Sequence, residues 1–358
     1  MRAFRILPDE AARLVDVDEP ALPAGWVRVA VTAAGICHSD VNVLNGVVGR
    51  AWDRPFTLGH EIAGTVIEVH PDADRAWLGT PCVLYAPSGC GDCRACARNE
   101  PNYCAHRTPT SEAGLGLGGD GGMADQVIVH PDRLVATREL DPATAAVLTD
   151  AGLTAYHAVS QVRHRGDAAV IVVIGVGGLG HLALQTLRHL TTARLVAVDR
   201  RPAARELALD SGAEVFCSPE DLPATLETLG SNGCVEAVVD FVGSAESIDL
   251  AAAHLLPDAD LVIVGSAMGS LTVGKHLAHL PRGLHLHFPS WGSRAELAEV
   301  ITLAERGILR PHVSSIGLDG IVDGLARLEA GQVLGRLVAQ PGGPSTPMQG
   351  STGSAPTP

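Results

Sequence analysis

The chain has 358 residues, which is long enough for two ordinary domains that each bury a core of their own. With 46% hydrophobic and 18% charged residues, its composition excludes disorder over most of the length. The formal net charge of −14 offers no basic stripe for a polyphosphate, which argues against nucleic acid as a partner.

The start of the chain and its most apolar segment indicate a cytoplasmic protein. The first residues, MRAFRILPDEAARLV, lack the apolar run and cleavage site of an export signal. The most apolar run, residues 168–184, is short for a bilayer span and is interrupted by glycines and a histidine. We therefore expect no membrane partner. In a reducing compartment, clustered cysteines bind metal more often than they form disulfides.

The first part of the chain is predicted to be β-rich, from Arg28 to about Val135. Short β-like segments separated by glycine and proline recur there: VRVAVTAAGI, EIAGTVIEV, PCVLYA and MADQVIVH. The segment that follows, LDPATAAVLTDAGLTAYHAV, is typical of a helix that begins at Asp141 and Pro142.

Beyond this helix, apolar runs alternate with amphipathic segments. The runs AVIVVIG, RLVAVD, EAVVDFVG and DLVIVGS are typical of parallel strands covered on both faces by helices. The sequence therefore predicts a doubly wound α/β domain. Near Ser293, the capping-box sequence SRAE predicts a helix that runs to Gly307. Residues 341–358, rich in Pro, Gly, Ser and Thr, predict a disordered tail.

A glycine-rich turn at the start of the α/β region predicts a dinucleotide site. The sequence GVGGLG places Gly175, Gly177 and Gly180 in a G-x-G-x-x-G pattern directly after a buried strand, with Gly178 and Leu179 inside the pattern. The first glycine allows the tight turn, the second lets the backbone approach a pyrophosphate, and the third lets helix and strand pack closely. The helix N-terminus would then face the phosphates.

The end of the next strand indicates which dinucleotide binds. Asp199 lies where an acid would accept hydrogen bonds from the adenosine ribose hydroxyls. The sequence therefore favours NAD, because the carboxylate would repel the 2′-phosphate of NADP. Arg200 and Arg201 would partly offset this repulsion, so some use of NADP stays open.

Two short motifs in the β-rich part contain metal-binding residue types. AAGICHSDVNV contains Cys37, and TLGHEIAGTV contains His60. Each residue taken alone would more often be a buried structural side chain. Beside a nicotinamide-binding fold, however, a thiolate and an imidazole suit zinc. A catalytic zinc also needs a third protein ligand and an open fourth position.

These motifs, taken in order, carry a family resemblance. The chain resembles the zinc-dependent medium-chain alcohol dehydrogenases, in a bacterial NAD-dependent branch similar to secondary-alcohol dehydrogenases, up to about Gln340. The shared motifs are GICHSD, GHEIAGTV, the cysteine cluster, DAGLTAYHAV, GVGGLG and GRLV. The resemblance implies a GroES-like zinc catalytic domain over residues 1–150 and 290–340, and an NAD-binding Rossmann domain over residues 151–289.

The resemblance assigns a catalytic zinc to Cys37, His60 and Asp150. The third position is a cysteine in the animal enzymes, but a carboxylate oxygen is also an accepted zinc ligand. Glu61 matches an acid that can approach the metal as an alternate ligand. Asp40 matches a residue that orients His60.

Residues beside these ligands are implied to move the proton of the alcohol. Ser39 matches the hydroxyl that accepts it. In many relatives the relay ends at a histidine three positions later, but this chain has Asn42 there, which cannot take up a proton. Release would then pass through His38, through water or directly from the ribose. His38 could instead contact the cofactor pyrophosphate.

The resemblance also implies contacts to the cofactor and to the substrate. The cofactor-contact positions are matched by Thr154, Val242 and Arg336, of which the arginine would pair with the pyrophosphate. The substrate-cleft positions are matched by Trp52, Leu117 and Trp291. Two indoles would favour apolar or aromatic substrates. The alternative interpretation is that both tryptophans only pack the core between the domains.

The cysteine cluster is implied to hold a second zinc. Its members, in the spacing C-x2-C-x2-C-x7-C, are Cys90, Cys93, Cys96 and Cys104. Four thiolates form a closed tetrahedron with no open position for a substrate, so this zinc would be structural. It would hold a loop that has too few apolar residues for a core of its own.

The expected function is therefore a zinc- and NAD-dependent alcohol dehydrogenase. It would transfer hydride reversibly between a small primary or secondary alcohol and nicotinamide, giving an aldehyde or a ketone, in a homotetramer or a homodimer. A zinc-free quinone or enoyl reductase would lack the ligand set. A polyol dehydrogenase, a thiol-adduct formaldehyde dehydrogenase and a non-catalytic NAD-binding protein are the alternatives.

Overall fold

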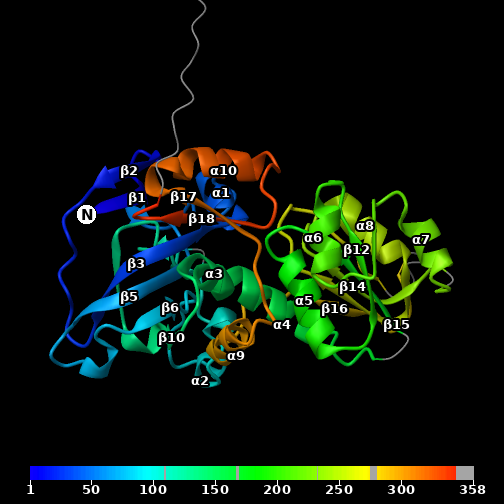
Figure 1. Cartoon of the computed structure of the whole chain (residues 1–358), viewed down its shortest axis with the longest axis horizontal. Helices are drawn as coiled ribbons and strands as arrows, with labels where there is room; N and C mark the ends of the chain where they lie inside the picture. Colours follow the sequence, from blue (N-terminus) through cyan, green and yellow to red (C-terminus); the bar gives the residue numbers. More distant parts are fainter. Residues whose placement is uncertain (109, 167–168, 232, 275–279, 344–358) are drawn as a thin grey trace, which may run out of the picture.

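Two large β-sheets organise the chain, one in each half of the molecule (Figure 1). The structure is a computed structural model, and it describes residues 1–108, 110–166, 169–231, 233–274 and 280–343. Most of the predicted disordered tail, residues 344–358, lies outside the described residues. Within the described ranges, no helix is both long enough and apolar enough to cross a membrane.

The first half is built on a seven-stranded sheet in which most neighbours are antiparallel. The strands follow the order β10-β6-β5-β3-β18-β17, and β9 also pairs with β3. Their bounds are β3 (Val27–Ile36), β5 (Glu61–Val69), β6 (Pro81–Leu84), β9 (Gln126–Val129), β10 (Leu134–Ala136), β17 (Val313–Gly317) and β18 (Arg336–Gln340). The predicted β-rich region is therefore confirmed, and the chain returns to its sheet with two strands near its end.

Smaller sheets and helices surround this sheet. The small strands are β1 (Arg2–Ile6), β2 (Ala12–Asp16), β4 (Phe56–Thr57), β7 (Gly114–Leu115) and β8 (Gly118–Gly119). The helices are α1 (His38–Leu44), α2 (Arg94–Ala97), α9 (Arg294–Glu305) and α10 (Ile321–Glu329). Short 3-10 turns are η1 (Arg75–Trp77), η2 (Pro101–Tyr103), η3 (Pro131–Arg133) and η5 (Leu318–Gly320). The predicted capping box is present at the start of α9, where Ser293 and Glu296 exchange hydrogen bonds.

A helical segment with one π turn connects the two halves. It consists of α3 (Pro142–Val147), the π turn η4 (Leu148–Gly152) and α4 (Leu153–Ser160). The Asp141 carboxylate accepts a hydrogen bond from the Thr144 amide at 2.9 Å, which caps the helix where the sequence predicted its start. The side of α3 packs on β3 and β5, and α4 packs on α5 of the other half. All five residues of the π turn are buried, and π turns of this kind are frequent at functional sites.

The second half is a six-stranded parallel sheet in the order β13-β12-β11-β14-β15-β16. The strands are β11 (Val170–Ile174), β12 (Arg194–Val198), β13 (Val215–Cys217), β14 (Val235–Asp240), β15 (Leu255–Ile263) and β16 (His285–His287). The helices are α5 (Gly180–Leu190), α6 (Ala204–Asp210), α7 (Leu222–Thr228) and α8 (Ala245–Ala253). Alternate residues of β11 belong to two different hydrophobic clusters. Ile171 and Val173 pack in one cluster, and Val170 and Val172 pack in the other. Burial on both faces explains why these runs are continuously apolar, and it confirms the doubly wound prediction.

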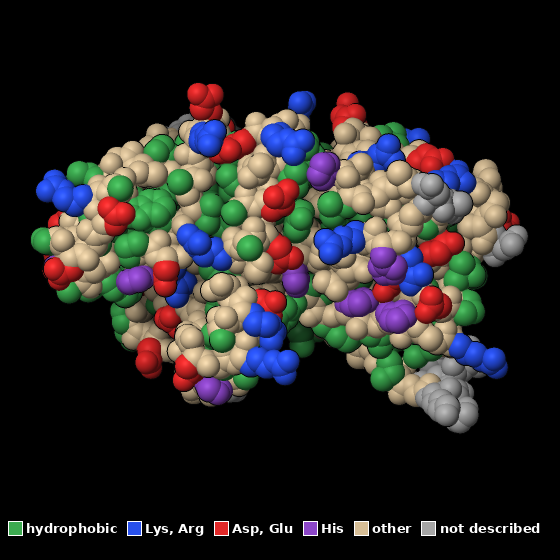
Figure 2. All heavy atoms as spheres, turned by 90° about the horizontal axis from the view of Figure 1, so that it is seen from below, with side chains coloured by type: hydrophobic (Ala, Val, Ile, Leu, Met, Phe, Trp, Pro, Cys, Tyr) green, Lys and Arg blue, Asp and Glu red, His purple; other side chains and the backbone are tan. Residues whose placement is uncertain are grey.

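Charged groups of both signs are interspersed on the face of the molecule shown in Figure 2, where a notch separates the two halves. Histidines gather on the second half in this view. In that half, His164 and His287 face Asp260, and His285 faces Asp258, with nitrogen–oxygen distances of 2.9 to 3.4 Å.

Candidate active site

Strand register and the π turn bring three metal-binding side chains together. Gly35 of β3 is paired with Glu61 of β5. Cys37, directly after β3, and His60, directly before β5, therefore lie at neighbouring strand ends. The π turn carries Asp150 over the same point. The Asp150 Oδ2 atom lies 3.4 Å from the His60 Nε2 atom and 3.6 Å from the Cys37 Sγ atom. All three side chains are buried.

These distances fit a tetrahedral metal ion. Zinc bonds of about 2.0 to 2.3 Å imply separations of roughly 3.4 Å between a nitrogen and an oxygen ligand and roughly 3.6 Å between a sulfur and an oxygen ligand. The measured distances of 3.4 and 3.6 Å agree with both values. Thiolate, imidazole and carboxylate are also the donor types that zinc accepts.

The charge around these ligands also favours a divalent cation. The carboxylates of Asp40, Glu61 and Asp150 are buried, and the guanidinium of Arg336 is buried beside two of them. One guanidinium cannot neutralise three carboxylates, even with a proton on His60, and uncompensated buried charge is costly. A bound dication would balance the site.

The protonation of the ligands follows from the same charges. Burial alone would raise the pKa of Asp150, but the bond to His60 and the charges of His60 and Arg336 outweigh it and lower this pKa to about 2. Burial would lower the pKa of His60, whereas Asp40, Asp150 and Cys37 raise it well above its usual value. A metal ion at this site would therefore compete with a proton on His60.

Two further side chains lie directly beside the ligands. The Asp40 Oδ1 atom lies 3.3 Å from the His60 Nδ1 atom, and its Oδ2 atom accepts a 2.8 Å hydrogen bond from the Cys37 amide. The Thr154 hydroxyl donates to the Asp150 Oδ1 atom at 2.8 Å. The sequence predicted the first arrangement through the resemblance. It assigned Thr154 to the cofactor, and the four-residue spacing on one helix was the signal that could have revealed the bond to Asp150.

Glu61 and Arg336 form a buried ion pair beneath the ligands. The Arg336 Nε atom donates to the Glu61 Oε2 atom at 3.0 Å, and its Nη2 atom donates to the Oε1 atom. Burial raises the pKa of Glu61, and Arg336 opposes that rise. A Cβ atom on Gly178 would lie 2.8 Å from the Arg336 Nη1 atom. Arg336 thus contacts both Glu61, which lies beside the metal ligands, and the glycine loop. Its bond to a pyrophosphate stays a prediction.

The glycine loop has the geometry of a phosphate-binding turn. Gly175 has a φ of +88°, and a Cβ atom on Gly180 would lie 1.9 Å from the Gly175 carbonyl oxygen. Both glycines are therefore required by the fold. At Gly177, a Cβ atom would meet only the Arg201 guanidinium, at 3.8 Å. Packing does not require a glycine there, so the bare backbone leaves room for a ligand. Leu179 is the N-cap residue of α5.

Asp199 follows β12 beside this loop, but its carboxylate is already occupied. It accepts hydrogen bonds from the Val176 amide at 2.8 Å and from the Arg201 side chain at 3.0 and 3.1 Å. Arg201 also donates to the carbonyl oxygen of Val333, from the first half, at 3.0 Å. Arg200 is exposed. A ribose that binds Asp199 would therefore share the carboxylate with Arg201, a competition that the sequence did not indicate.

The turn after β14 places Val242 against the loop. A Cβ atom on Gly175 would lie 2.8 Å from the Val242 Cγ2 atom. The buried Asp240 carboxylate holds this turn by accepting hydrogen bonds from the amides of Val242 and Gly243 at 2.8 and 3.0 Å. Asp240 was missed in the sequence, where it stands inside the apolar run EAVVDFVG.

A buried histidine, also missed, supports the glycine loop from below. The His181 Nδ1 atom donates to the Gly177 carbonyl oxygen at 2.7 Å, and its Nε2 atom accepts from the His312 amide at 3.0 Å. This pair of bonds requires the neutral imidazole. Burial lowers the pKa of His181 to about 4.

We expect His181 to make the protein less stable in mild acid. Between pH 6.5 and about pH 4, the unfolded chain binds a proton on this residue that the folded chain does not, so the free energy of unfolding falls as the pH falls through this window. The full contribution would be about 3 kcal/mol. Denaturant unfolding from pH 7 to 4.5 should show a shallower pH dependence for His181→Gln than for the exposed control His189→Gln. Equal slopes would contradict the assignment.

The residues predicted to move the proton lie at the mouth of the site. The Ser39 Oγ atom is 3.6 Å from the Cys37 Sγ atom. His38 is exposed, and partial loss of solvent together with the charges of Arg336 and Arg201 lowers its pKa. The Asn42 side chain donates to the Ser266 hydroxyl of the second half at 3.2 Å, so it bridges the two halves.

The three predicted pocket residues separate into two groups. The Trp291 ring packs edge to face with the His60 ring, with centroids 6.2 Å apart. Trp52 is half-buried and packs against Phe56, with centroids 6.0 Å apart. Leu117 is buried and precedes Gly118, where a Cβ atom would lie 3.1 Å from the Trp52 ring. Trp291 is therefore the pocket candidate that touches a metal ligand.

The four clustered cysteines converge on a second point. The sulfurs of Cys90 and Cys96 are 3.9 Å apart, and those of Cys93 and Cys104 are 4.0 Å apart. A zinc ion with four bonds of about 2.3 Å places its sulfurs roughly 3.8 Å apart, whereas a disulfide bond is only about 2.0 Å long. The spacing fits a closed four-thiolate metal site. We call residues 89–104 the cysteine lobe.

Comparison with known proteins identifies the family of this chain. The family model of the alcohol dehydrogenase GroES-like domain matches residues 23–139, and that of the zinc-binding dehydrogenase matches residues 178–306. An NAD-dependent alcohol dehydrogenase of Sulfolobus acidocaldarius is 31% identical, over 92% of this chain and 96% of that protein. The chain belongs to the zinc-dependent medium-chain alcohol dehydrogenase family.

Two other similar proteins illustrate the range of this family. The alcohol dehydrogenase of the hyperthermophilic archaeon Aeropyrum pernix superposes with a TM-score of 0.86 at 31% identity, covering 95% of this chain and 100% of that one. A D-arabinose 1-dehydrogenase (NADP(+)) of Saccharolobus solfataricus is 28% identical, over 93% of this chain and 95% of that protein. As expected from the sequence, this dehydrogenase joins a GroES-like domain to a Rossmann domain and is an NAD-dependent zinc enzyme acting on alcohols.

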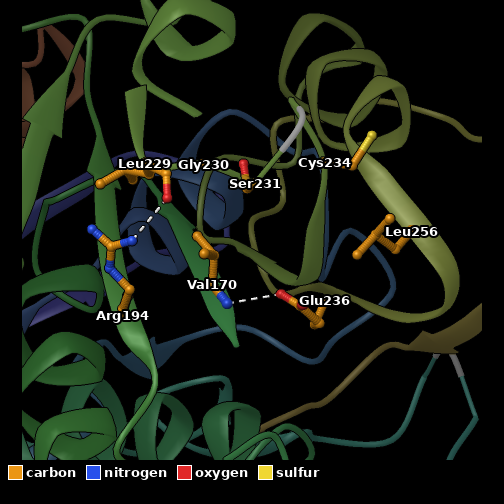
Figure 3. Close-up of a pocket in the computed structure, with 8 residues that line it drawn as sticks. All are labelled: Val170, Arg194, Leu229, Gly230, Ser231, Cys234, Glu236 and Leu256. Atoms are coloured by element: carbon orange, nitrogen blue, oxygen red, sulfur yellow. Dashed lines mark hydrogen bonds between the residues drawn. The ribbon is translucent and has the colours of Figure 1, made fainter. Parts of the chain in front are cut away.

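A cavity of about 410 Å³ in this dehydrogenase lies away from the active site (Figure 3). It is lined by residues at the amino ends of the parallel strands, including Val170, Arg194 and Glu236. Arg194 donates to the Leu229 carbonyl oxygen, and the Val170 amide donates to Glu236. Nucleotides bind at the carboxyl ends of such strands, where the glycine loop lies, so this cavity is not the cofactor site.

Proposed function

We propose that the dehydrogenase oxidises a primary or secondary alcohol with NAD⁺ at the site formed by Cys37, His60 and Asp150, and reduces the carbonyl product in reverse. The observation that carries this proposal is the spacing of the three donor atoms, which matches a tetrahedral zinc with an open fourth position. The open position would take the substrate oxygen.

The protein contributes alignment and proton transfer. When bound, zinc would polarise the substrate oxygen and NAD would take up the hydride. Asp40 and Thr154 hold His60 and Asp150 in place for the metal. The Ser39 hydroxyl, 3.6 Å from the Cys37 sulfur, is the group that would take the substrate proton. His38, whose lowered pKa leaves it neutral at pH 7, would accept that proton at the surface, because Asn42 cannot.

We also propose NAD as the preferred cofactor. Asp199 would accept hydrogen bonds from the ribose hydroxyls and would repel a 2′-phosphate. Arg201 neutralises part of that charge, which would leave a measurable activity with NADP. The pyrophosphate would lie over Gly177, between the N-terminus of α5 and Arg336.

The substrate and the assembly are the less specified parts of the proposal. The indoles of Trp52 and Trp291 favour apolar or aromatic alcohols. A polyol or sugar is the second candidate, because one relative is a D-arabinose 1-dehydrogenase. We propose a homotetramer or a homodimer in the cytoplasm, a compartment that suits a chain whose eight cysteines form no disulfide bond.

One experiment tests the function. The purified protein is assayed for NAD⁺ and NADP⁺ reduction with primary, secondary, aromatic and polyol substrates, and its metal content is measured on the same sample. We expect about two zinc ions per chain and faster turnover with NAD⁺ than with NADP⁺ on a secondary or aromatic alcohol. Absence of turnover with every alcohol and carbonyl, in protein that contains both zinc ions, would refute the proposal.

A further inference from the structure

Trp291 is held in a costly conformation beside the active site. Its φ of +50° lies in the left-handed region, which is a genuine outlier for a bulky side chain. Of the five non-glycine residues with positive φ among the described residues, only Trp291 is buried. Its buried indole Nε1 atom also has no hydrogen-bond partner there. Such strain persists only where the surroundings over-determine the conformation.

The backbone before and after Trp291 is bonded to buried side chains. The Asn102 amide donates to the Ser290 carbonyl oxygen at 2.9 Å. The Tyr85 hydroxyl donates to the Gly292 carbonyl oxygen at 2.7 Å. Both donors are at least nine-tenths buried. The backbone on each side of Trp291 is therefore clamped by a hydrogen bond from another element.

Asn102 belongs to the cysteine lobe, two residues before Cys104. The next residue makes a second connection, because the Tyr103 hydroxyl lies 2.8 Å from the His157 Nε2 atom. The His157 Nδ1 atom lies 2.8 Å from the Glu296 carboxylate, which caps α9 directly after Trp291. The lobe thus reaches the Trp291 segment by two routes.

Trp291 in turn contacts a metal ligand. Its ring meets the His60 ring at 78°, with centroids 6.2 Å apart. The His60 ring must keep one orientation to direct its Nδ1 atom at Asp40 and its Nε2 atom towards Asp150. An indole packed against this ring restricts its rotation.

We propose that the cysteine lobe positions the active-site histidine, and that Asn102 is the positioning residue that transmits this through Trp291. The lobe would then do more than hold its own loop, because a metal ion bound by its four cysteines would keep Asn102 at the Ser290 carbonyl oxygen. The expected change in kcat/KM rests on the proposed function. The placement of Trp291 rests on the fold alone.

The test combines Asn102→Leu, which keeps the volume but removes the donor, with Trp291→Phe and the double variant. Arg98→Ala is the matched control, because Arg98 lies in the same lobe and pairs only with the half-exposed Glu100. The emission of Trp291 is isolated by subtracting the spectrum of W291F. We expect N102L to shift this emission to longer wavelength and to lower kcat/KM about tenfold, mainly through kcat. R98A should change neither.

The double variant shows whether Asn102 acts through Trp291. We expect N102L to have no further effect on kcat/KM in the W291F background, because coupled residues are not additive. Effects that multiply, or an unshifted Trp291 emission in N102L, would overturn the proposal.

Two further controls keep the test conclusive. If N102L loses a zinc ion, Asn102→Asp replaces it, because a carboxylate of similar volume cannot donate the amide hydrogen bond to the Ser290 carbonyl oxygen. The same emission shift is then expected, and its absence would overturn the proposal. Wild-type protein without turnover would refute the proposed function alone, since the emission measurement needs no substrate.

Discussion

Replacement of Cys37 by serine is expected to lower kcat/KM by about a thousandfold or more and to remove one of two bound zinc ions. The thiolate is one of three protein ligands, and a serine hydroxyl stays protonated near neutral pH, so it binds zinc weakly. Losing the Lewis acid would remove several kcal/mol of transition-state stabilisation, and about 4 kcal/mol corresponds to a thousandfold change in rate.

Metal analysis together with steady-state kinetics measures both effects. Cys234→Ser is the matched control, because Cys234 lines the cavity at the opposite edge of the Rossmann sheet and should keep both zinc ions and full activity. A C37S protein with one zinc ion and little activity fits the site described above. Full activity in C37S would show that the working metal lies elsewhere.

Replacement of Arg336 by methionine is expected to lower the free energy of unfolding by about 3 to 5 kcal/mol. This guanidinium is buried against Glu61, and its removal leaves that buried carboxylate without its cation. An exposed pair behaves differently. Arg194→Met breaks the half-exposed pair with Glu214 and a bond to the Leu229 carbonyl oxygen, and it should cost about 1 to 2 kcal/mol or less.

Denaturant unfolding of the zinc-loaded protein checks this expectation. Adding Glu61→Gln to R336M should restore part of the lost stability, because the uncompensated carboxylate is then removed. The same R336M protein is expected to bind NAD more weakly, since Arg336 also lies against Gly178 of the glycine loop. If R336M lowered the free energy of unfolding no more than R194M does, Arg336 would not be needed to balance the buried charge.

Features that repeat locally along the chain could be predicted from the sequence. The strand bounds of β3 and β5 follow from their β-branched and apolar runs, and the α5 turn follows from its glycines. The family motifs also singled out Cys37, His60 and Asp150, which the structure brings together. The predicted domain boundaries and the role of each site residue stay predictions.

Side-chain partners that depend on tertiary register could not be predicted. The bond between Glu61 and Arg336 joins residues 275 positions apart, and it exists because β18 pairs with β3 beside β5. The capture of Asp199 by Arg201 depends on a rotamer, which no pattern of residue types encodes. His181 looked like one more residue of an amphipathic helix, because its two partners, Gly177 and His312, lie in separate parts of the chain.

The π turn at residues 148–152 places a strict length constraint on this part of the chain. A π turn is one residue longer than an α turn, so deleting a residue there would regenerate a regular helix. Everything before the deletion would then rotate by about 100° relative to everything after it. Asp150 would no longer lie beside Cys37 and His60, and α3 would no longer pack on β3. The position of the third metal ligand therefore depends on the length of this segment, and we expect a deletion there to abolish the three-ligand site.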